Sequence, residues 1–232
     1  LPFTLFVATD PVGGREYMTW DQLREMAQMD LATIGSQTAT HPHLPLLSPE
    51  QIREQLERSQ ARFKAELGQA PDLIAYPYGE YSTTVQEITR EVGFVAGFGQ
   101  QSGAIARTSE RYGLPRFALN EAYGGMDRFR TAVNALPLPV HDVVPDDNLL
   151  GPDDNPPMYG FTVDESVPSL AGLTCYAGGR GEVPVQRLGG QRVEVRFDKP
   201  FPKGRMRINC TLMGPDNRWR WFGNQFLVKG AE

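Results

Sequence analysis

The sequence has no excess of positive charge and no long hydrophobic run. Its 23 Lys and Arg face 28 Asp and Glu, which leaves a net charge of -5, whereas nucleic-acid binders usually present a basic face to phosphates. No apolar run approaches the roughly 20 residues that span a bilayer. We therefore expect neither a nucleic-acid partner nor a transmembrane segment. What is left is an acidic globular protein of 232 residues, long enough for one large domain or two modest ones.

Histidine is also scarce, and its placement is informative. Two of the three histidines lie in the polar segment Gly35-Ser36-Gln37-Thr38-Ala39-Thr40-His41-Pro42-His43, which directly follows the apolar run Ala32-Thr33-Ile34. In α/β folds a polar loop at the carboxyl end of a strand is held by the strand, while its side chains face a cleft. The pattern predicts a functional site in this loop.

The segment Gln37-Thr38-Ala39-Thr40-His41-Pro42 resembles the His-Ser/Thr-x-x-His-Pro motif of the NodB-type polysaccharide deacetylases, carbohydrate esterase family four. The resemblance implies a divalent metal, with zinc favoured, held by His41 and by Gln37 in the position of the first histidine. A glutamine carbonyl is a weaker zinc ligand than imidazole. Gln37 is thus either a degraded ligand or a substitute that orients substrate. His43 is a bystander or a replacement ligand, and we favour the bystander.

A second stretch, Leu73-Ile74-Ala75-Tyr76-Pro77-Tyr78-Gly79, is similar to the family's Arg-x-Pro-Tyr-Gly motif. The resemblance implies that Tyr78 is catalytic, because its backbone amide would stabilise the oxyanion, while Pro77 and Tyr76 would wall the substrate site. A preorganised amide of this kind is worth roughly 3 kcal/mol. Ala75 stands where the family has arginine, and we expect Arg116 to supply that charge from another strand.

Two family motifs are missing from the sequence. It contains neither the Thr-Phe-Asp-Asp strand that supplies the catalytic base nor a late Leu-x-His motif that supplies the general acid. Because Leu1 to Val7 looks like the family's later strand, we expect a fragment or processed form that is inactive by itself. Two hypotheses follow. The parent protein is a metal-dependent deacetylase of an acetylated polysaccharide, or it is a pseudoenzyme that binds polysaccharide without catalysis.

Periodicity predicts an α/β domain over residues 1–135. Short apolar runs alternate with amphipathic helices, which indicates parallel strands joined by crossovers. With the resemblance, this implies an incomplete distorted (β/α) barrel of the NodB type that lacks its first βα unit. Strands are expected at 3–7, 32–34, 73–76, 94–98 and 114–119, and helices at 19–28, 49–67, 83–92 and 127–135. Ser48 should cap the longest helix, with Pro49 in its first position and Gln51 completing a capping box.

The sequence pattern changes after residue 135. Residues 136–157 are rich in proline and predict a linker. Residues 158–232 predict a small antiparallel β-sandwich domain of about five to seven strands. Strictly alternating runs at 192–197 and 205–210 flank a turn at 200–204, a pattern typical of a hairpin.

This β-domain holds further candidates. Cys175 and Cys210 are compatible with a disulfide or with two buried thiols, and the polysaccharide resemblance favours the disulfide. Trp219 and Trp221 are either core residues or, with neighbouring arginines, a platform on which sugar rings stack. The resemblance also implies a periplasmic, cell-envelope or secreted location.

Overall fold

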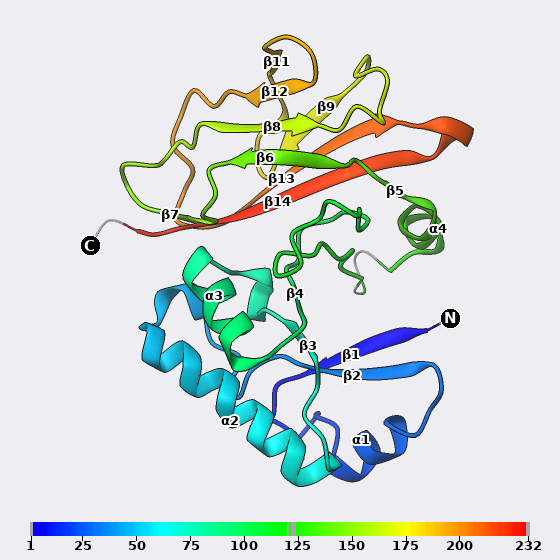
Figure 1. The fold of residues 1–232 in the computed structure, drawn as a ribbon, viewed down its shortest axis with the longest axis vertical. Helices are drawn as coiled ribbons and strands as arrows, with labels where there is room; N and C mark the ends of the chain where they lie inside the picture. Colours follow the sequence, from blue (N-terminus) through cyan, green and yellow to red (C-terminus); the bar gives the residue numbers. More distant parts are fainter. Residues whose placement is uncertain (1, 120, 122–123, 231–232) are drawn as a thin grey trace. The chain divides into compact units, whose positions relative to one another are not determined.

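The structure, a computed structural model, describes residues 2–119, 121 and 124–230, and it divides into two compact units (Figure 1). The first unit consists of Leu1–Gly99 with Arg111–Gly113. The second consists of Gln100–Glu110 with Leu114–Glu232. Each unit has its own hydrophobic core.

A parallel sheet with the strand order β1-β2-β3-β4 forms the centre of the first unit. Its elements in chain order are β1 (Phe3–Val7), α1 (Trp20–Met26), β2 (Ala32–Ser36), a 3-10 helix (Leu44–Leu46), α2 (Pro49–Leu67), β3 (Leu73–Ala75), a 3-10 helix (Pro77–Gly79), α3 (Thr83–Val92) and β4 (Ala96–Phe98). The alternation of strands and helices that the sequence predicts is confirmed over this stretch.

Local capping signals place the helix ends. Ser48 caps α2 through a capping box with Gln51, and the helix ends at Gly68, whose φ of 80° is left-handed. Glycine adopts this conformation without the steric cost that a Cβ imposes. Gly93 ends α3 in the same way, with φ 102°. These boundaries follow from a few residues of local sequence and agree with the prediction.

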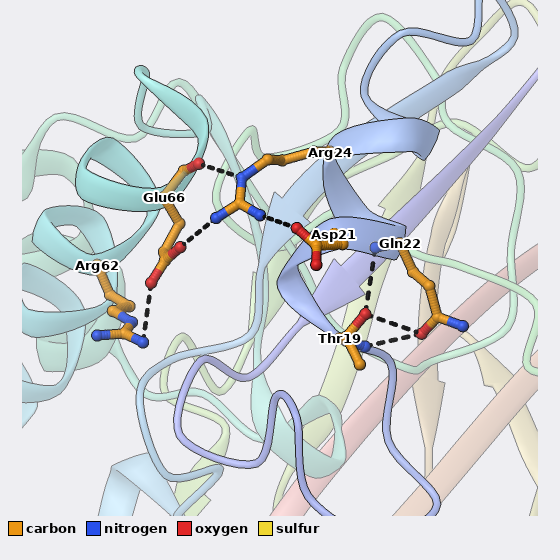
Figure 2. Close-up of polar contacts among 6 residues, drawn as sticks. All are labelled: Thr19, Asp21, Gln22, Arg24, Arg62 and Glu66. Atoms are coloured by element: carbon orange, nitrogen blue, oxygen red, sulfur yellow. Dashed lines mark hydrogen bonds and ion pairs between the residues drawn. The ribbon is translucent and has the colours of Figure 1, made fainter.

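Ion pairs attach the short helix α1 to the end of α2, as Figure 2 shows. The Arg24 guanidinium donates to the Glu66 carbonyl oxygen at 3.1 Å and to its carboxylate at 2.6 Å, and it also pairs with Asp21. Arg62 reaches the same Glu66 carboxylate at 2.9 Å. Isolated ion pairs on a protein surface contribute little to stability, whereas several charges that share a network contribute more.

Tyr76 is a large side chain of the first unit's core. Its side chain is fully buried, and its hydroxyl donates to the Tyr112 carbonyl oxygen at 2.9 Å. The adjacent strand β4 passes close to this ring. A Cβ added at Gly97 would lie 2.3 Å from the Tyr76 hydroxyl oxygen, so a glycine is needed where the strand passes the ring.

Two sheets make up most of the second unit. One has the order β10-β9-β13-β14-β5, with β7 also paired to β14, and the other has the order β11-β12-β8-β6. Strand pairs are antiparallel except those that β14 makes with β5 and β7. The elements are α4 (Met126–Asn134), β5 (Leu136–Pro137), β6 (Val140–Val144), β7 (Leu149–Leu150), β8 (Tyr159–Val163), β9 (Thr174–Ala177), β10 (Gly181–Val183), β11 (Val185–Arg187), β12 (Arg192–Val195), β13 (Gly204–Met213), a 3-10 helix (Pro215–Asn217) and β14 (Trp219–Val228).

Strands from both sheets contribute to one core in this unit. Phe161 and Val193 come from one sheet, and Ile208 and Phe226 come from the other. Within this core Cys175 and Cys210 form a disulfide between the neighbouring strands β9 and β13, where the two residues are register partners. Of the two alternatives that the sequence left open, the disulfide is the one observed.

The predicted hairpin over residues 192–210 is wrong, although both strands exist. Strand β12 pairs with β8 and β11, whereas β13 pairs with β14 and β9 in the other sheet. The connection at 200–204 therefore crosses between sheets. Alternation determines which face of a strand is apolar, but each of these strands satisfies that pattern with either partner.

The predicted strand at 114–119 and the predicted linker also differ from the structure. Beyond an isolated bridge at Leu114, residues 115–119 have irregular backbone. Pro115 has no N–H to donate, and the Arg116 N–H donates to the Gln101 carbonyl oxygen at 3.1 Å. Residues 136–157 contribute β5, β6 and β7 to the sheets of the second unit. The second unit thus begins well before the boundary expected near residue 135. Among the described residues no helix is both long and apolar enough to cross a membrane.

The disulfide yields a first prediction. Replacing both cysteines, Cys175→Ala with Cys210→Ala, should lower the free energy of unfolding by about 2–4 kcal/mol, because the bond closes a loop with a sequence separation of 35 residues. Urea unfolding followed by tryptophan fluorescence measures this change, since Trp219 and Trp221 lie in β14. Thiol titration of the denatured, unreduced chain should detect no free thiol. Two titratable thiols would contradict the assignment.

The close approach of β4 to Tyr76 yields a second prediction. Gly97→Ala should destabilise the first unit by about 1–3 kcal/mol, because the added methyl overlaps a ring that its own hydrogen bond holds in place. Thermal unfolding measures the loss. In a Tyr76→Phe background, which removes the nearest overlapping atom, the same substitution should cost less. An equal cost in both backgrounds would show that the overlap with the hydroxyl is not the cause.

Candidate functional site

The pairing of β2 with β3 brings the two predicted site loops to one edge of the sheet. The strands are parallel, and Ser36 is the register partner of Ile74. The loop that contains His41 follows β2, and the turn that contains Tyr78 follows β3. Carboxyl ends of parallel strands lie at the same edge, which is where α/β folds bind ligands.

Hydrogen bonds to neighbouring elements hold the His41 loop. The Gln37 N–H donates to the Val7 carbonyl oxygen at 2.8 Å, and the Thr9 N–H donates to the Thr38 carbonyl oxygen at 3.1 Å. The Thr38 hydroxyl accepts from the His41 N–H at 3.0 Å. From α2, the Gln55 side-chain oxygen accepts from the Thr40 N–H at 3.0 Å. The loop is therefore attached to both β1 and α2.

Left-handed backbone is concentrated at this edge. Among the described residues, six non-glycine residues have positive φ, and three of them are Thr38, His41 and Tyr78, with φ of 70°, 61° and 57°. This conformation costs an ordinary residue roughly 1–2 kcal/mol, and such strain clusters at functional sites. Both predicted loops thus contain backbone that the surrounding structure must hold in place.

The side chains of the two loops meet at Tyr78. The His43 ring stacks on the Tyr78 ring, with centroids 4.2 Å apart and planes at 12°. His41 meets the same ring edge-on, at 4.6 Å and 71°. The His43 Nδ1 lies 2.6 Å from the Glu80 carboxylate, whose side chain is only 1% exposed. His43 is therefore part of the arrangement and not the bystander that we expected.

Glu80 is the residue that the sequence reasoning missed. The available signal was its position directly after Tyr-Pro-Tyr-Gly, since a carboxylate next to a site motif is a candidate partner for a histidine. Its burial and its contact with a residue 37 positions away appear only in the folded chain.

Other predicted residues lie elsewhere than expected. Tyr76 was expected to contact substrate, but its ring is fully buried among the core residues of the first unit, so that prediction is wrong. The backbone turns after Tyr76, and the side chain that follows the turn, Tyr78, is partly exposed. Pro77 begins the turn and is buried. Ala75 is buried in β3.

Arg116 and the two tryptophans belong to the second unit. Burial, and secondarily the nearby Arg207 guanidinium, lower the pKa of Arg116. The Trp221 indole N–H donates to the Asn209 side-chain oxygen at 3.2 Å, and its ring packs edge-on against Phe117. Trp219 is 40% exposed. Trp221 is partly buried, and the neighbouring Phe222 packs against the core of this unit.

The residues at the site do not by themselves fit a divalent metal. Within the described residues no group of three or more His, Cys, Asp or Glu side chains is arranged to hold a metal ion. His41 is the one predicted ligand of a type that zinc prefers, Gln37 offers only an amide oxygen, and the Nδ1 of His43 is engaged with Glu80. We therefore derive no catalytic step through a metal on this chain.

Comparison with known proteins places the first unit. Residues 1–97 match the family model described as polysaccharide deacetylase. A Bacillus subtilis (strain 168) protein named "Putative polysaccharide deacetylase YxkH" is 28% identical over 122 residues, which cover 53% of this chain and 43% of that protein. The chain thus spans less than half the length of this curated relative.

Solved structures show the same fold. The Streptococcus pyogenes deacetylase PplD, solved in complex with acetate, is similar with a TM-score of 0.52 at 22% identity, covering 56% of this chain and 58% of that one. BC0361, a polysaccharide deacetylase from Bacillus cereus, has a TM-score of 0.51 at 20% identity, covering 57% of this chain and 42% of that one. Residues 1–97 thus match a polysaccharide deacetylase domain of the NodB type, and the two solved structures, both under 25% identical, have the same fold.

Proposed function

We propose that the protein carrying this chain hydrolyses N-acetyl or O-acetyl groups of a cell-envelope or extracellular polysaccharide. The observation that carries the proposal is the left-handed turn at Tyr78, which follows β3 and contacts His41 from the neighbouring loop. The turn lies within the residues that match the deacetylase family.

The chemistry of the reaction explains why such a turn is useful. Hydrolysis of an acetamide or acetate ester passes through a tetrahedral species whose oxygen gains negative charge. A backbone N–H that is already oriented stabilises this charge without reorganising during the reaction. In the proposal the Tyr78 amide is that donor, while His41 and Gln37 bind and orient the acetylated sugar. A divalent metal is general in the family, but the ligands of this chain do not complete a site for it.

A second candidate function is binding of polysaccharide without catalysis. Two replacements favour it, since Gln37 stands where the family has a ligand histidine and Ala75 stands where it has an arginine. Both replacements remove functional groups from the side chains, while the backbone of the two loops stays in place. The exposed Trp219 and Tyr176, at 40% and 42% exposure, are proposed contacts for sugar rings in the second unit.

We also propose the type of fold for each unit and the cellular compartment of the protein. The parallel sheet of the first unit is proposed as part of a distorted (β/α) barrel, and the two sheets that share a core in the second unit as a β-sandwich. A disulfide is consistent with an oxidising compartment, so we propose a periplasmic, cell-envelope or secreted protein.

Acetate release from N-acetylglucosamine oligomers and from O-acetylated sugars tests the proposal. The assay compares this chain with a form extended by any coding sequence that precedes Leu1, and metal content is measured alongside. We expect release by the extended form and at least a roughly 100-fold loss in its His41→Ala variant, the size of effect that follows removal of a group acting on the reacting atoms.

The matched control is His141→Ala, since His141 is an exposed histidine of the second unit that also pairs with a carboxylate, that of Asp142. This variant should keep full activity. Oligosaccharide binding by calorimetry without acetate release, in both forms, would reject the deacetylase and support the binding protein.

A further inference from the structure

The Tyr78 turn needs support from outside its own backbone. Within it the Gly79 N–H bonds the Tyr76 carbonyl oxygen at 2.9 Å, and the Glu80 N–H bonds the Pro77 carbonyl oxygen at 3.1 Å. Tyr78 itself has φ 57° and ψ 5°. A residue with a Cβ adopts these angles at a steric cost, so it stays there only where neighbouring contacts outweigh that cost.

Glu80 and His43 provide such contacts. The Glu80 carboxylate is almost completely buried, and burial of a carboxylate is costly unless hydrogen bonds compensate. One compensating bond runs to the His43 Nδ1 at 2.6 Å. His43 is 48% exposed, so burial alone does not immobilise its ring. The bond to Glu80 determines the orientation of the ring.

These two contacts, together with the backbone of the turn, connect Glu80, His43 and Tyr78 to one another. Glu80 lies two residues after Tyr78 on the same turn, and it holds His43 of the other loop. The His43 ring in turn lies flat on the Tyr78 ring, at 4.2 Å and 12°. Any rotation of Tyr78 out of the left-handed region would separate the stacked rings. The contacts among these three residues therefore oppose relaxation of the turn.

We propose that Glu80 and His43 are positioning residues that hold the Tyr78 turn, and with it the Tyr78 backbone amide, in its left-handed conformation. Neither residue acts on the reacting atoms. The catalytic role of these contacts rests on the proposed function, in which the Tyr78 backbone N–H donates a hydrogen bond to the oxyanion. The structural claim does not depend on that function.

Amide hydrogen exchange tests the structural claim on this chain. Exchange by mass spectrometry is followed in a peptide that spans Tyr76 to Tyr81. We expect His43→Ala and Glu80→Gln to accelerate exchange there at least 10-fold while other peptides of the first unit stay unchanged. His141→Ala is the matched control, because His141 has 49% exposure and its own carboxylate partner in Asp142 at 2.8 Å, but belongs to the second unit.

Two further variants separate the two contacts. His43→Phe keeps an aromatic ring for Tyr78 and removes the bond to Glu80, whereas His43→Gln keeps a donor for Glu80 and removes the stack. Both should accelerate exchange, each less than His43→Ala. If His43→Ala does not fold, exchange in these two variants and in Glu80→Gln tests whether the contacts hold the turn. Unchanged exchange in folded variants would overturn the proposal.

The catalytic role is tested by acetate-release kinetics, with this chain or the extended chain, whichever releases acetate. Glu80→Gln and His43→Ala should lower kcat at least 10-fold with little change in KM, because the amide acts on charge that appears in the transition state. A rise in KM alone would overturn the positioning role. If no form releases acetate, the proposed function fails, and the exchange experiment still decides whether Glu80 and His43 hold the turn.

Discussion

The parallel pairing of β2 with β3 is the constraint on which the candidate site depends. A single register pair, Ser36 with Ile74, aligns the strand ends so that the His41 loop and the Tyr78 turn begin at the same edge. A side chain in one loop can then reach a carboxylate in the other, as His43 reaches Glu80. Without that alignment, residues 37 positions apart would have no reason to meet.

The site combines backbone strain with buried polar contacts, and each explains the other. Left-handed residues in both loops would relax if they were free to do so. The bonds of the loop to Val7 and Gln55, and the contact between Glu80 and His43, oppose that relaxation. Rigid elements thus support a short, strained segment, which is the arrangement that a preorganised binding site requires.

The family resemblance indicates the type of domain, whereas the side chains at the site determine which chemistry it can perform. The motif match and the family comparison identify the domain, and the structure shows that the two motifs lie together. Gln37 stands where the motif of the resemblance has a histidine, and a difference in one side chain changes the chemistry available without changing the fold around it. Fold and function are separable in this way because a fold depends on cores and registers, whereas activity depends on a few side chains.

Features governed by neighbours in the chain could be predicted from the sequence. The limits of α2 follow from Ser48, Gln51 and Gly68, and the alternation of β12 and β13 follows from their own residues. That the two candidate loops follow strand ends could also be predicted, because each directly follows a short apolar run.

Only the tertiary structure decided which elements pair and which side chains are buried. It separated β12 from β13, added residues 136–157 to the sheets, enclosed the Tyr76 ring in the core and brought Glu80 to His43. The physical reason is that capping and periodicity are local properties of a few successive residues. Strand partners, burial and contacts between loops depend on the free energy of the whole packed chain, to which residues distant in sequence contribute equally.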